Sequence, residues 1–268
     1  MIKKVGVFKR LLIVIGTIGF LLTTSYYITE VQANAGYGWG FKPNDNHKQP
    51  EVGIYKDILE RHNAYYVGNS HRKEIYLTFD AGYENGFTDD ILDVLKQHDV
   101  PATFFVTGTY MKNNPNLIKR MVNEHHTVGN HTFTHPDMTA IDITQYKKEL
   151  KRVEDEFYKL TNQDMMKIMR PPRGRFSDRS LKIADDLGYH NIFWSLAFKD
   201  WETKNQHGWQ YAYNSVMNRI HPGAVILLHT VSEDNAKALS HIISDLREEG
   251  YDFVPIKNLL TQKVPLVE

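Results

Sequence analysis

Short apolar runs of strand length alternate with longer segments of helical periodicity from residue 75 to residue 254. The strand-like runs are residues 75–79, 102–106, 126–130, 167–170, 191–195, 224–229 and 251–254. The helical segments between them are residues 88–98, 115–124, 143–160, 178–187, 208–220 and 233–249. Because strand and helix alternate, we expect a parallel sheet with helices packed outside it.

The residues at the ends of these segments agree with the expected helices. Asp142 and Ser177 stand where an N-cap is needed, and Pro115 takes a first helical position. Gly188 and Gly250 follow two helix ends, where glycine commonly closes a helix. Seven strands in one domain favour an α/β fold with a distorted (β/α)7-type barrel. Periodicity alone leaves an open doubly wound sheet as the alternative.

Residues 1–35 have the pattern of a targeting segment. Four basic residues precede the apolar run 11–22, and "ANA" (33–35) has the small-residue form of a cleavage site, so we expect a signal peptide that is cut after Ala35. The alternative is an uncleaved membrane anchor, because residues 11–29 carry no charge and are just long enough to span a bilayer. In either case we expect export, with action outside the cytoplasm at the cell wall or membrane surface.

Composition narrows the classes of site and partner. The chain has no cysteine, which excludes disulfides, cysteine nucleophiles and thiolate metal sites. It has 32 basic and 32 acidic residues, and removing the four basic residues and one acidic residue of 1–35 leaves 28 and 31, a net charge near −3. No charge run builds a basic face, so we expect no nucleic-acid partner and no membrane contact beyond the N-terminal segment. The sequence does not indicate an oligomeric state.

Residues 36–74 are interpreted as an N-terminal extension that lies on a catalytic domain of residues 75–262. Residues 42–50 have the composition of a loop, and one helix is expected within residues 52–67.

Polar residues follow five of the expected strands, at the end where folds of this type place their reactive groups. Asp80 follows the first strand, "HTFTH" (131–135) the third, "RPPRG" (170–174) the fourth and "KDW" (199–201) the fifth, while His229 ends the sixth. Each has a structural alternative: an aspartate that caps a turn, a surface arginine, a packed indole or a core histidine. Their occurrence together on five strand ends favours one common site.

His131 and His135 stand four residues apart. On a helical turn this spacing brings two imidazoles to one side, as a metal site requires. The alternative is a pair of loop histidines that bond to backbone groups. Their place after a strand, with an aspartate ending another strand, favours metal ligands.

These motifs resemble those of the polysaccharide deacetylases, the NodB-homology enzymes of carbohydrate esterase family 4. "TFDAG" is similar to the family's TFDDG, "HTFTH" to H-[ST]-x-x-H, "RPPRG" to RPPYG, "KDW" to DxxDW and "LLH" (227–229) to LxH. The resemblance runs from about residue 74 to 260. Longer strings such as "GNHTFTHPDM" and "FWSLAFKDW", with "WGFK" (39–42), resemble the PdaA-type branch of delta-lactam-biosynthetic de-N-acetylases from spore-forming bacilli. That branch deacetylates N-acetylmuramic acid in spore-cortex peptidoglycan, and the freed amine goes on to form muramic δ-lactam.

The resemblance implies metal-assisted hydrolysis of an N-acetyl amide on peptidoglycan glycan strands. His131 and His135 would hold a divalent metal, expected to be zinc, that polarises the acetyl carbonyl. Asp80 would be the general base, which Arg170 keeps oriented and ionised.

The remaining roles fall on the later motifs. His229 would be the general acid that protonates the departing amine, held by Asp200. The backbone N–H of Arg173 would help to stabilise the oxyanion. Trp201 and Leu227 would form an apolar wall, with Leu227 beside the acetyl methyl group.

The sequence departs from the family pattern at three positions. Ala81 stands where the family has the third protein ligand of the metal, so that ligand is uncertain, and Glu84 or Asn85 are the candidates nearby. Ala197 replaces the first Asp of DxxDW. Arg173 replaces the Tyr of RPPYG, and an arginine can bind the lactyl carboxylate that N-acetylmuramic acid has and N-acetylglucosamine lacks. We expect Arg173 to select muramoyl sugars; the alternative is an arginine that faces solvent.

Three other functions compete with an N-acetylmuramic acid deacetylase. A deacetylase of N-acetylglucosamine in peptidoglycan or chitin oligomers shares the chemistry, but Arg173 argues against it. A catalytically inactive module that binds wall glycan is favoured only by Ala81, because a binder needs neither base nor acid. A hydrolase of small amides fits poorly with an export signal.

Overall fold

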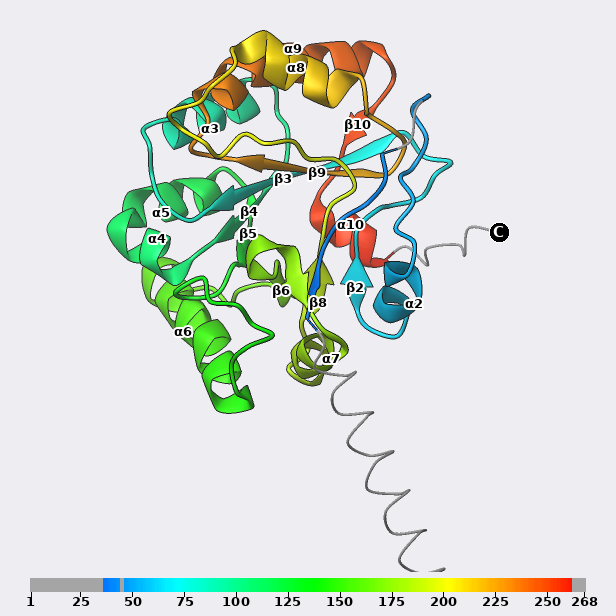
Figure 1. The fold of residues 1–268 in the computed structure, drawn as a ribbon. Coiled ribbons are helices and arrows are strands. Elements are labelled where there is room, and N and C mark those ends of the chain that lie inside the picture. The colour runs from blue at the N-terminus through cyan, green and yellow to red at the C-terminus, as the bar shows by residue number, and fades with distance from the viewer. Residues whose placement is uncertain (1–35, 44–45, 262–268) are drawn as a thin grey trace, which may run out of the picture.

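The computed structural model describes residues 36–43 and 46–261 (Figure 1). The expected signal peptide or anchor (1–35) and residue 262, the expected end of the catalytic domain, lie outside this part. Within the described ranges, none of the helices has the length and apolar character needed to cross a bilayer.

Eight described strands form one sheet, in the order β10-β3-β4-β5-β6-β8-β2, and β9 pairs with β3 as well. Every pair in this sheet is parallel, as the alternation of strand and helix predicts. The strands are β2 (Ala64–Tyr65), β3 (Glu74–Ala81), β4 (Thr103–Val106), β5 (Thr127–Asn130), β6 (Ile168–Met169), β8 (His190–Ile192), β9 (Ala224–His229) and β10 (Asp252–Phe253).

The sheet closes on itself where the segment that follows β8 bonds to β9. The N–H of Ser195, just after β8, donates to the carbonyl of Val225 (3.0 Å), and the N–H of Leu227 donates to the carbonyl of Leu196 (2.9 Å). The other side of β9 pairs with β3. Because β9 is bonded on both sides, the sheet is a distorted barrel, which confirms the predicted (β/α)7-type fold. The eighth strand, β2, belongs to the extension and was not predicted.

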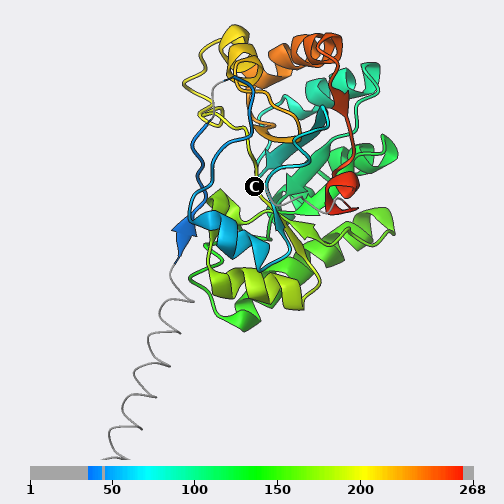
Figure 2. The same cartoon turned by 90° about the vertical axis from the view of Figure 1, so that its right-hand side faces the viewer.

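Helices pack around the sheet, with α8 and α9 side by side (Figures 1 and 2). They are α2 (Tyr55–Glu60), α3 (Thr88–Gln97), α4 (Gly108–Asn113), α5 (Pro115–Asn123), α6 (Ile143–Thr161), α7 (Asp178–Asp186), α8 (Trp209–Met217), α9 (Glu233–Glu248) and α10 (Ile256–Thr261). The predicted helices are all present with ends shifted by at most a few residues, whereas α4 and α10 were not predicted.

Side-chain alternation along β3 creates two apolar layers. Leu77, Phe79 and Ala81 pack in the large cluster between sheet and helices. Tyr76 instead packs with Val225 and other interior residues in a second cluster. Asp80 is an even position like Tyr76, so it points into the barrel, while Ala81 points towards the helices.

The N-terminal extension lies against the barrel beside the "RPPRG" turn. Strand β1 (Tyr37–Gly38) pairs antiparallel with β7 (Arg175–Phe176). The backbone N–H of Trp39 donates to the carbonyl of Gly174 (2.8 Å), and its indole N–H donates to the carbonyl of Trp194 (3.0 Å). Strand β2 of the extension pairs with β8 of the barrel, so the extension is part of the same sheet. A domain boundary between residues 74 and 75 stays a prediction.

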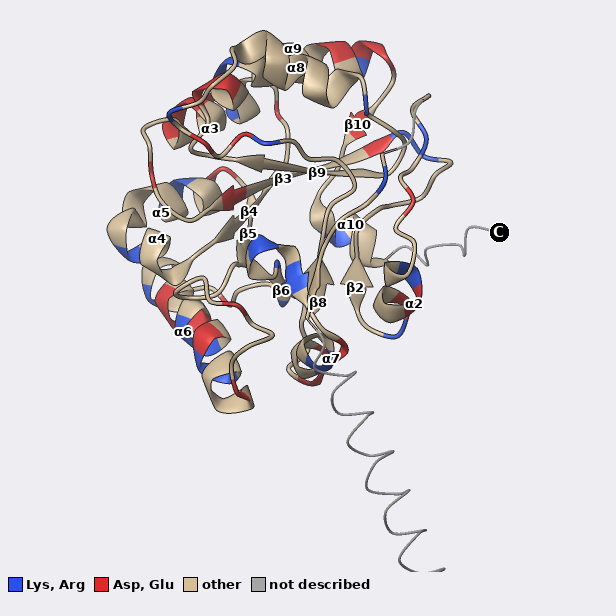
Figure 3. Cartoon of the chain, viewed as in Figure 1, with Lys and Arg blue, Asp and Glu red and all other residues tan. Residues whose placement is uncertain are grey.

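Charges of both signs are interspersed over the face shown in Figure 3, and α6 carries Lys or Arg and Asp or Glu along its length.

Candidate active site

Asp80 and Arg170 form a buried pair at the carboxyl end of β3. Nη1 of Arg170 donates to Oδ1 of Asp80 (2.8 Å), Nη2 donates to the hydroxyl of Thr78 (2.9 Å), and Nε donates to the carbonyl of Ile192 (3.0 Å). Arg170 is fully buried and Asp80 is 8% exposed. Burial alone would raise the pKa of Asp80, but the nearby charge of Arg170, helped by His131, outweighs it and holds this pKa below its ordinary value. Asp80 is therefore an ionised carboxylate at neutral pH.

His131 and His135 lie beside this pair with their ring centroids 4.8 Å apart. Nδ1 of His131 donates to the carbonyl of Arg170 (2.9 Å), which leaves Nε2 unprotonated, 3.5 Å from Oδ2 of Asp80. Burial lowers the pKa of His131, and it lowers that of His135 to about 4. Both rings are thus neutral at neutral pH, the form in which imidazole binds metals.

The two histidines do not share a helical turn, contrary to the interpretation of their spacing. Residues 131–135 form a turn in which Thr132 (φ 65°) and His135 (φ 60°) both have left-handed backbone conformations. These two residues fold the chain back sharply enough to bring the rings together.

Ala81 and the two residues considered as third ligands in its place, Glu84 and Asn85, all have other surroundings or partners. Ala81 is fully buried in the outer core. Glu84 accepts from the hydroxyls of Thr88 (2.5 Å) and Tyr110 (2.7 Å). The amide of Asn85 donates to the backbone carbonyl of Val231, after β9 (2.9 Å).

A metal would therefore meet two protein ligands. In the part of the chain that the structure describes, no three His, Cys, Asp or Glu side chains are grouped to hold a metal ion. His131 and His135 are neutral, adjacent and, for His131, fixed in the tautomer that frees Nε2. They fit a divalent cation as a two-imidazole half-site whose remaining positions are open to water or substrate.

His229 and Asp200 form a second pair opposite Asp80. His229 ends β9 and is the register partner of Asp80 on β3. Its Nδ1 donates to Oδ1 of Asp200 (2.7 Å), and its backbone N–H donates to Oδ2 (2.8 Å), which also accepts from the amide of Asn235 (2.6 Å). Burial would lower the pKa of His229, but the negative charge of Asp200 outweighs burial and raises it. The pair therefore favours the protonated imidazolium that a general acid needs.

The residues predicted to contact the substrate lie beside the mouth of the barrel, the end at which β3 and β9 bring Asp80 and His229 together. The half-exposed ring of Trp201 lies 5.5 Å from that of His229, centroid to centroid. Leu227 is buried on the same face of β9 as His229, one step deeper, opposite Thr78. These positions give an apolar wall and floor beside His229.

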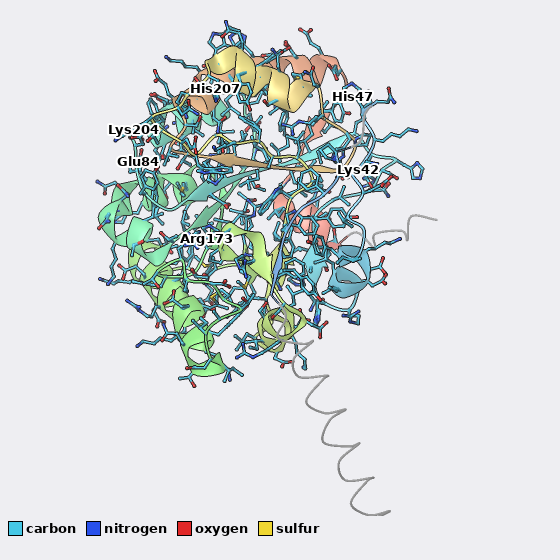
Figure 4. The ribbon with its side chains drawn as sticks, viewed as in Figure 1. Lys42, His47, Glu84, Arg173, Lys204 and His207 are labelled. Atoms are coloured by element: carbon cyan, nitrogen blue, oxygen red, sulfur yellow. The ribbon has the colours of Figure 1, made fainter. Side chains whose placement is uncertain are left out.

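Arg173 lies in the 3-10 turn Pro172–Gly174 with a left-handed backbone (φ 57°) and an exposed side chain. Figure 4 shows it on the same side as Glu84, towards the carboxyl ends of the strands, while Lys42 and His47 lie at the opposite end. No hydrogen bond or ion pair to another described residue holds its guanidinium. After burial and His131, its charge contributes to the lowered pKa of His135, which places Arg173 near the imidazoles.

Two residues that complete the pairs were missed from the sequence. Thr78 bonds to Arg170, and Asn235 bonds to Asp200. Thr78 lies two positions before Asp80 on one strand face and could have been found by that spacing. No signal in the sequence singles out Asn235.

The sequence of this chain is similar to those of known polysaccharide deacetylases. Residues 67–192 match the family model described as polysaccharide deacetylase. Over 235 residues the chain is 49% identical to the peptidoglycan-N-acetylmuramic acid deacetylase PdaA of Bacillus subtilis (strain 168), covering 87% of this chain and 89% of that protein. This chain belongs to the polysaccharide deacetylase family.

Solved structures agree with the assignment. The structure of Bacillus subtilis PdaA, described as a family 4 carbohydrate esterase, matches with a TM-score of 0.83 over 85% of this chain and 97% of that one, at 49% identity. A family 4 pseudoenzyme from Bacillus anthracis, BA3943, matches with a TM-score of 0.69 at 34% identity over 75% of this chain and 70% of that one. The polysaccharide deacetylase described here has the NodB-homology fold and is a hydrolase that acts on polysaccharide amide bonds.

Proposed function

We propose that this enzyme removes the acetyl group from N-acetylmuramic acid residues of peptidoglycan. The observation that carries the proposal is the register pairing of Asp80 with His229, one held ionised by Arg170 and the other held protonated by Asp200. A base and an acid that face one mouth are what amide hydrolysis requires. The identity with PdaA, which is named for this substrate, supports the choice of sugar.

The base side of the reaction uses Asp80. Its Oδ1 is bonded to Arg170, so Oδ2 is available to take the proton of a water molecule as the water oxygen attacks the acetyl carbon. A divalent cation on His131 and His135, which we propose to be zinc, would polarise the acetyl carbonyl and lower the pKa of water. The backbone N–H of Arg173 is proposed to stabilise the negative oxygen that forms.

The acid side uses His229. Its Nδ1 is bonded to Asp200, so Nε2–H is the proton that passes to the sugar nitrogen as the C–N bond breaks. Acetate and a free amine leave. Asp200 keeps the imidazole oriented and favours its protonated form before each cycle.

Arg173 is proposed to recognise the muramoyl sugar through its lactyl carboxylate. Its exposed guanidinium lacks a described partner and lies near the imidazoles. Trp201 and Leu227 would hold the sugar and the acetyl methyl group against the acid.

The selector role has a matched control in Arg175, two residues away, whose Nε already pairs with Asp137 (2.7 Å). A charge-assisted hydrogen bond is worth about 1.5–3 kcal/mol, so Arg173→Ala should raise KM on muramoyl glycan by roughly 10- to 100-fold. The activity of Arg173→Ala on N-acetylglucosamine oligomers should differ little from that of wild type. Arg175→Ala should have a KM on muramoyl glycan close to that of wild type. Equal losses on both sugars would show that Arg173 is no selector.

The cellular setting is part of the proposal. Peptidoglycan lies outside the cytoplasm, which agrees with export by residues 1–35. The resemblance to delta-lactam-biosynthetic enzymes supports a role in sporulation, in which the freed amine goes on to form muramic δ-lactam in the spore cortex.

The test is acetate release from peptidoglycan glycan strands stripped of peptide, with mass analysis of the muropeptides. Wild type should remove acetyl from muramic acid residues, and Asp80→Asn should not. Chelation should stop the reaction and zinc should restore it.

An inactive wall-binding module is the second candidate, because Ala81 removes the usual third ligand and a family 4 pseudoenzyme is among the related structures. Binding of wall glycan without acetate release under any metal condition would favour it over the enzyme.

A further inference from the structure

The turn of residues 131–135, which carries both imidazoles, is held from two sides. On one side the first N–H groups of α4 bind its carbonyls: Gly108 donates to Thr132 (3.1 Å) and Thr109 donates to Phe133 (3.2 Å). These bonds fix the carbonyls of the turn and leave its N–H groups to find acceptors elsewhere.

The other side is held by Glu149 of α6, a carboxylate that is only 1% exposed. Its Oε2 accepts from the backbone N–H groups of Phe133 (2.9 Å) and Thr134 (2.7 Å). Its Oε1 accepts from the hydroxyl of Thr134 (2.9 Å) and the amide of Gln145 (3.2 Å). Three of the four bonds go to residues between the two histidines. Among the described residues, no basic side chain forms an ion pair with this carboxylate.

The turn would be costly to keep without these bonds. Two of its residues have left-handed backbones, which cost of order 1–3 kcal/mol each and persist only where the surrounding structure imposes them. Removing the carboxylate would also leave the buried N–H of Phe133 without an acceptor, at about 1–3 kcal/mol, and would free the N–H of the more exposed Thr134.

The ring of Phe133 shows how tightly the turn is seated. A Cβ at Gly108 would lie 2.0 Å from this ring. The guanidinium carbon of Arg152, on the same helix as Glu149, lies 3.5 Å from the centroid of this ring. The turn is thus packed between α4 and α6, with Glu149 as its only described carboxylate anchor.

We propose that Glu149 is a positioning residue that holds His131 and His135 in the arrangement that binds a divalent cation. The inference rests on the metal role in the proposed function. Because Ala81 supplies no third donor, affinity depends on how well two imidazoles are pre-arranged, and outer partners of metal ligands typically change metal affinity by about 10- to 100-fold.

The variants separate positioning from general stability. Glu149→Ala removes all four bonds. Glu149→Gln is the conservative variant, because its amide oxygen can accept from both N–H groups while its NH2 faces the hydroxyl of Thr134 and the amide of Gln145, both of which can turn to accept. Asp234→Ala is the matched control: Asp234 is a buried carboxylate whose Oδ2 accepts from two consecutive backbone N–H groups, of His207 and Gly208 (both 2.8 Å).

The measurement is the affinity of the full, chelator-treated chain for Zn²⁺, by competition with a chromophoric chelator, together with thermal unfolding without metal. We expect Glu149→Ala to lose about 10- to 100-fold in Zn²⁺ affinity and Glu149→Gln to recover most of it. Asp234→Ala should lower the melting temperature but bind Zn²⁺ like wild type.

Three results would overturn the proposal. If Glu149→Ala binds Zn²⁺ as tightly as wild type, the positioning role is wrong while the proposed deacetylase function stands. If Asp234→Ala loses as much affinity, the effect is general destabilisation. Acetate release by wild type that survives chelation, with no Zn²⁺ binding, would instead remove the metal from the proposed function and this inference with it.

Discussion

The pair formed by His229 and Asp200 makes a quantitative prediction for the variant Asp200→Asn. Asp200 is 4% exposed, and each of its oxygens has a hydrogen-bond donor. Asparagine has nearly the same size and can still accept at one position, so the fold should be kept. The change removes the negative charge that raises the pKa of His229.

The size of the effect follows from the 2.7 Å bond between Nδ1 and Oδ1. A hydrogen bond to a charged group contributes about 1.5–3 kcal/mol and a neutral one about 0.5–1.5 kcal/mol, a difference of roughly 1–1.5 kcal/mol. This difference favours the neutral imidazole, so the pKa of His229 should fall when the charge of Asp200 is removed. A general acid must be protonated, so the alkaline limb of kcat/KM should move to lower pH.

The assay is acetate release measured against pH, with Asp234→Asn as the control. Asp234 is the neighbouring buried carboxylate on α9 and bonds to backbone N–H groups rather than to His229. Its variant has the same change in charge and should leave the alkaline limb within a few tenths of a unit. An unmoved limb in Asp200→Asn, or an equal shift in the control, would refute His229 as the acid that Asp200 supports.

Three further changes test the structure. Arg170→Met should destabilise the protein by about 3–5 kcal/mol in urea unfolding, because Asp80 stays buried without its partner, and Arg170→Met with Asp80→Asn should recover part of this loss. Trp39→Ala should cost about 3 kcal/mol by the same assay, and Trp39→Phe should cost less because it loses only the bond to Trp194 and part of the packing. Gly174→Ala should lower the melting temperature, since Gly174 has φ 62° and a Cβ there would lie 2.8 Å from the side chain of Trp39.

Sequence patterns predicted the barrel because its strands are buried on both faces. Strand β9 reads "AVILLH" and needs no partner to be recognised. Strand β2 is only "AY", and it is a strand because its register with β8 supplies the hydrogen bonds. Helix α4, of six residues before Pro115, is too short to show a period. Elements defined by tertiary contacts rather than by their own pattern were therefore missed.

The polar groups at the mouth were predictable for a topological reason. Parallel strands end on one side of a sheet, so residues that follow different strands arrive together without being close in sequence. Asp80 and His229 meet in this way, 149 positions apart, through the register of β3 and β9. The partner bonds of Thr78 and Asn235 depend on side-chain directions that this rule does not contain.

The burial of Glu149 could have been predicted from the pattern of apolar positions in α6. The segment "KKELKR" (147–152) and the acidic residues 154–156 have the composition of a solvated helix face of mixed charge, and most of α6 agrees with this. Yet the buried residues of α6 are Tyr146, Glu149, Leu150, Val153 and Phe157, spaced at three and four positions. Glu149 lies within that apolar stripe, where a charged side chain is destabilising unless something satisfies it. A carboxylate on the buried face therefore predicts a set of donors across the interface, and in this fold the donors belong to the turn between the two histidines.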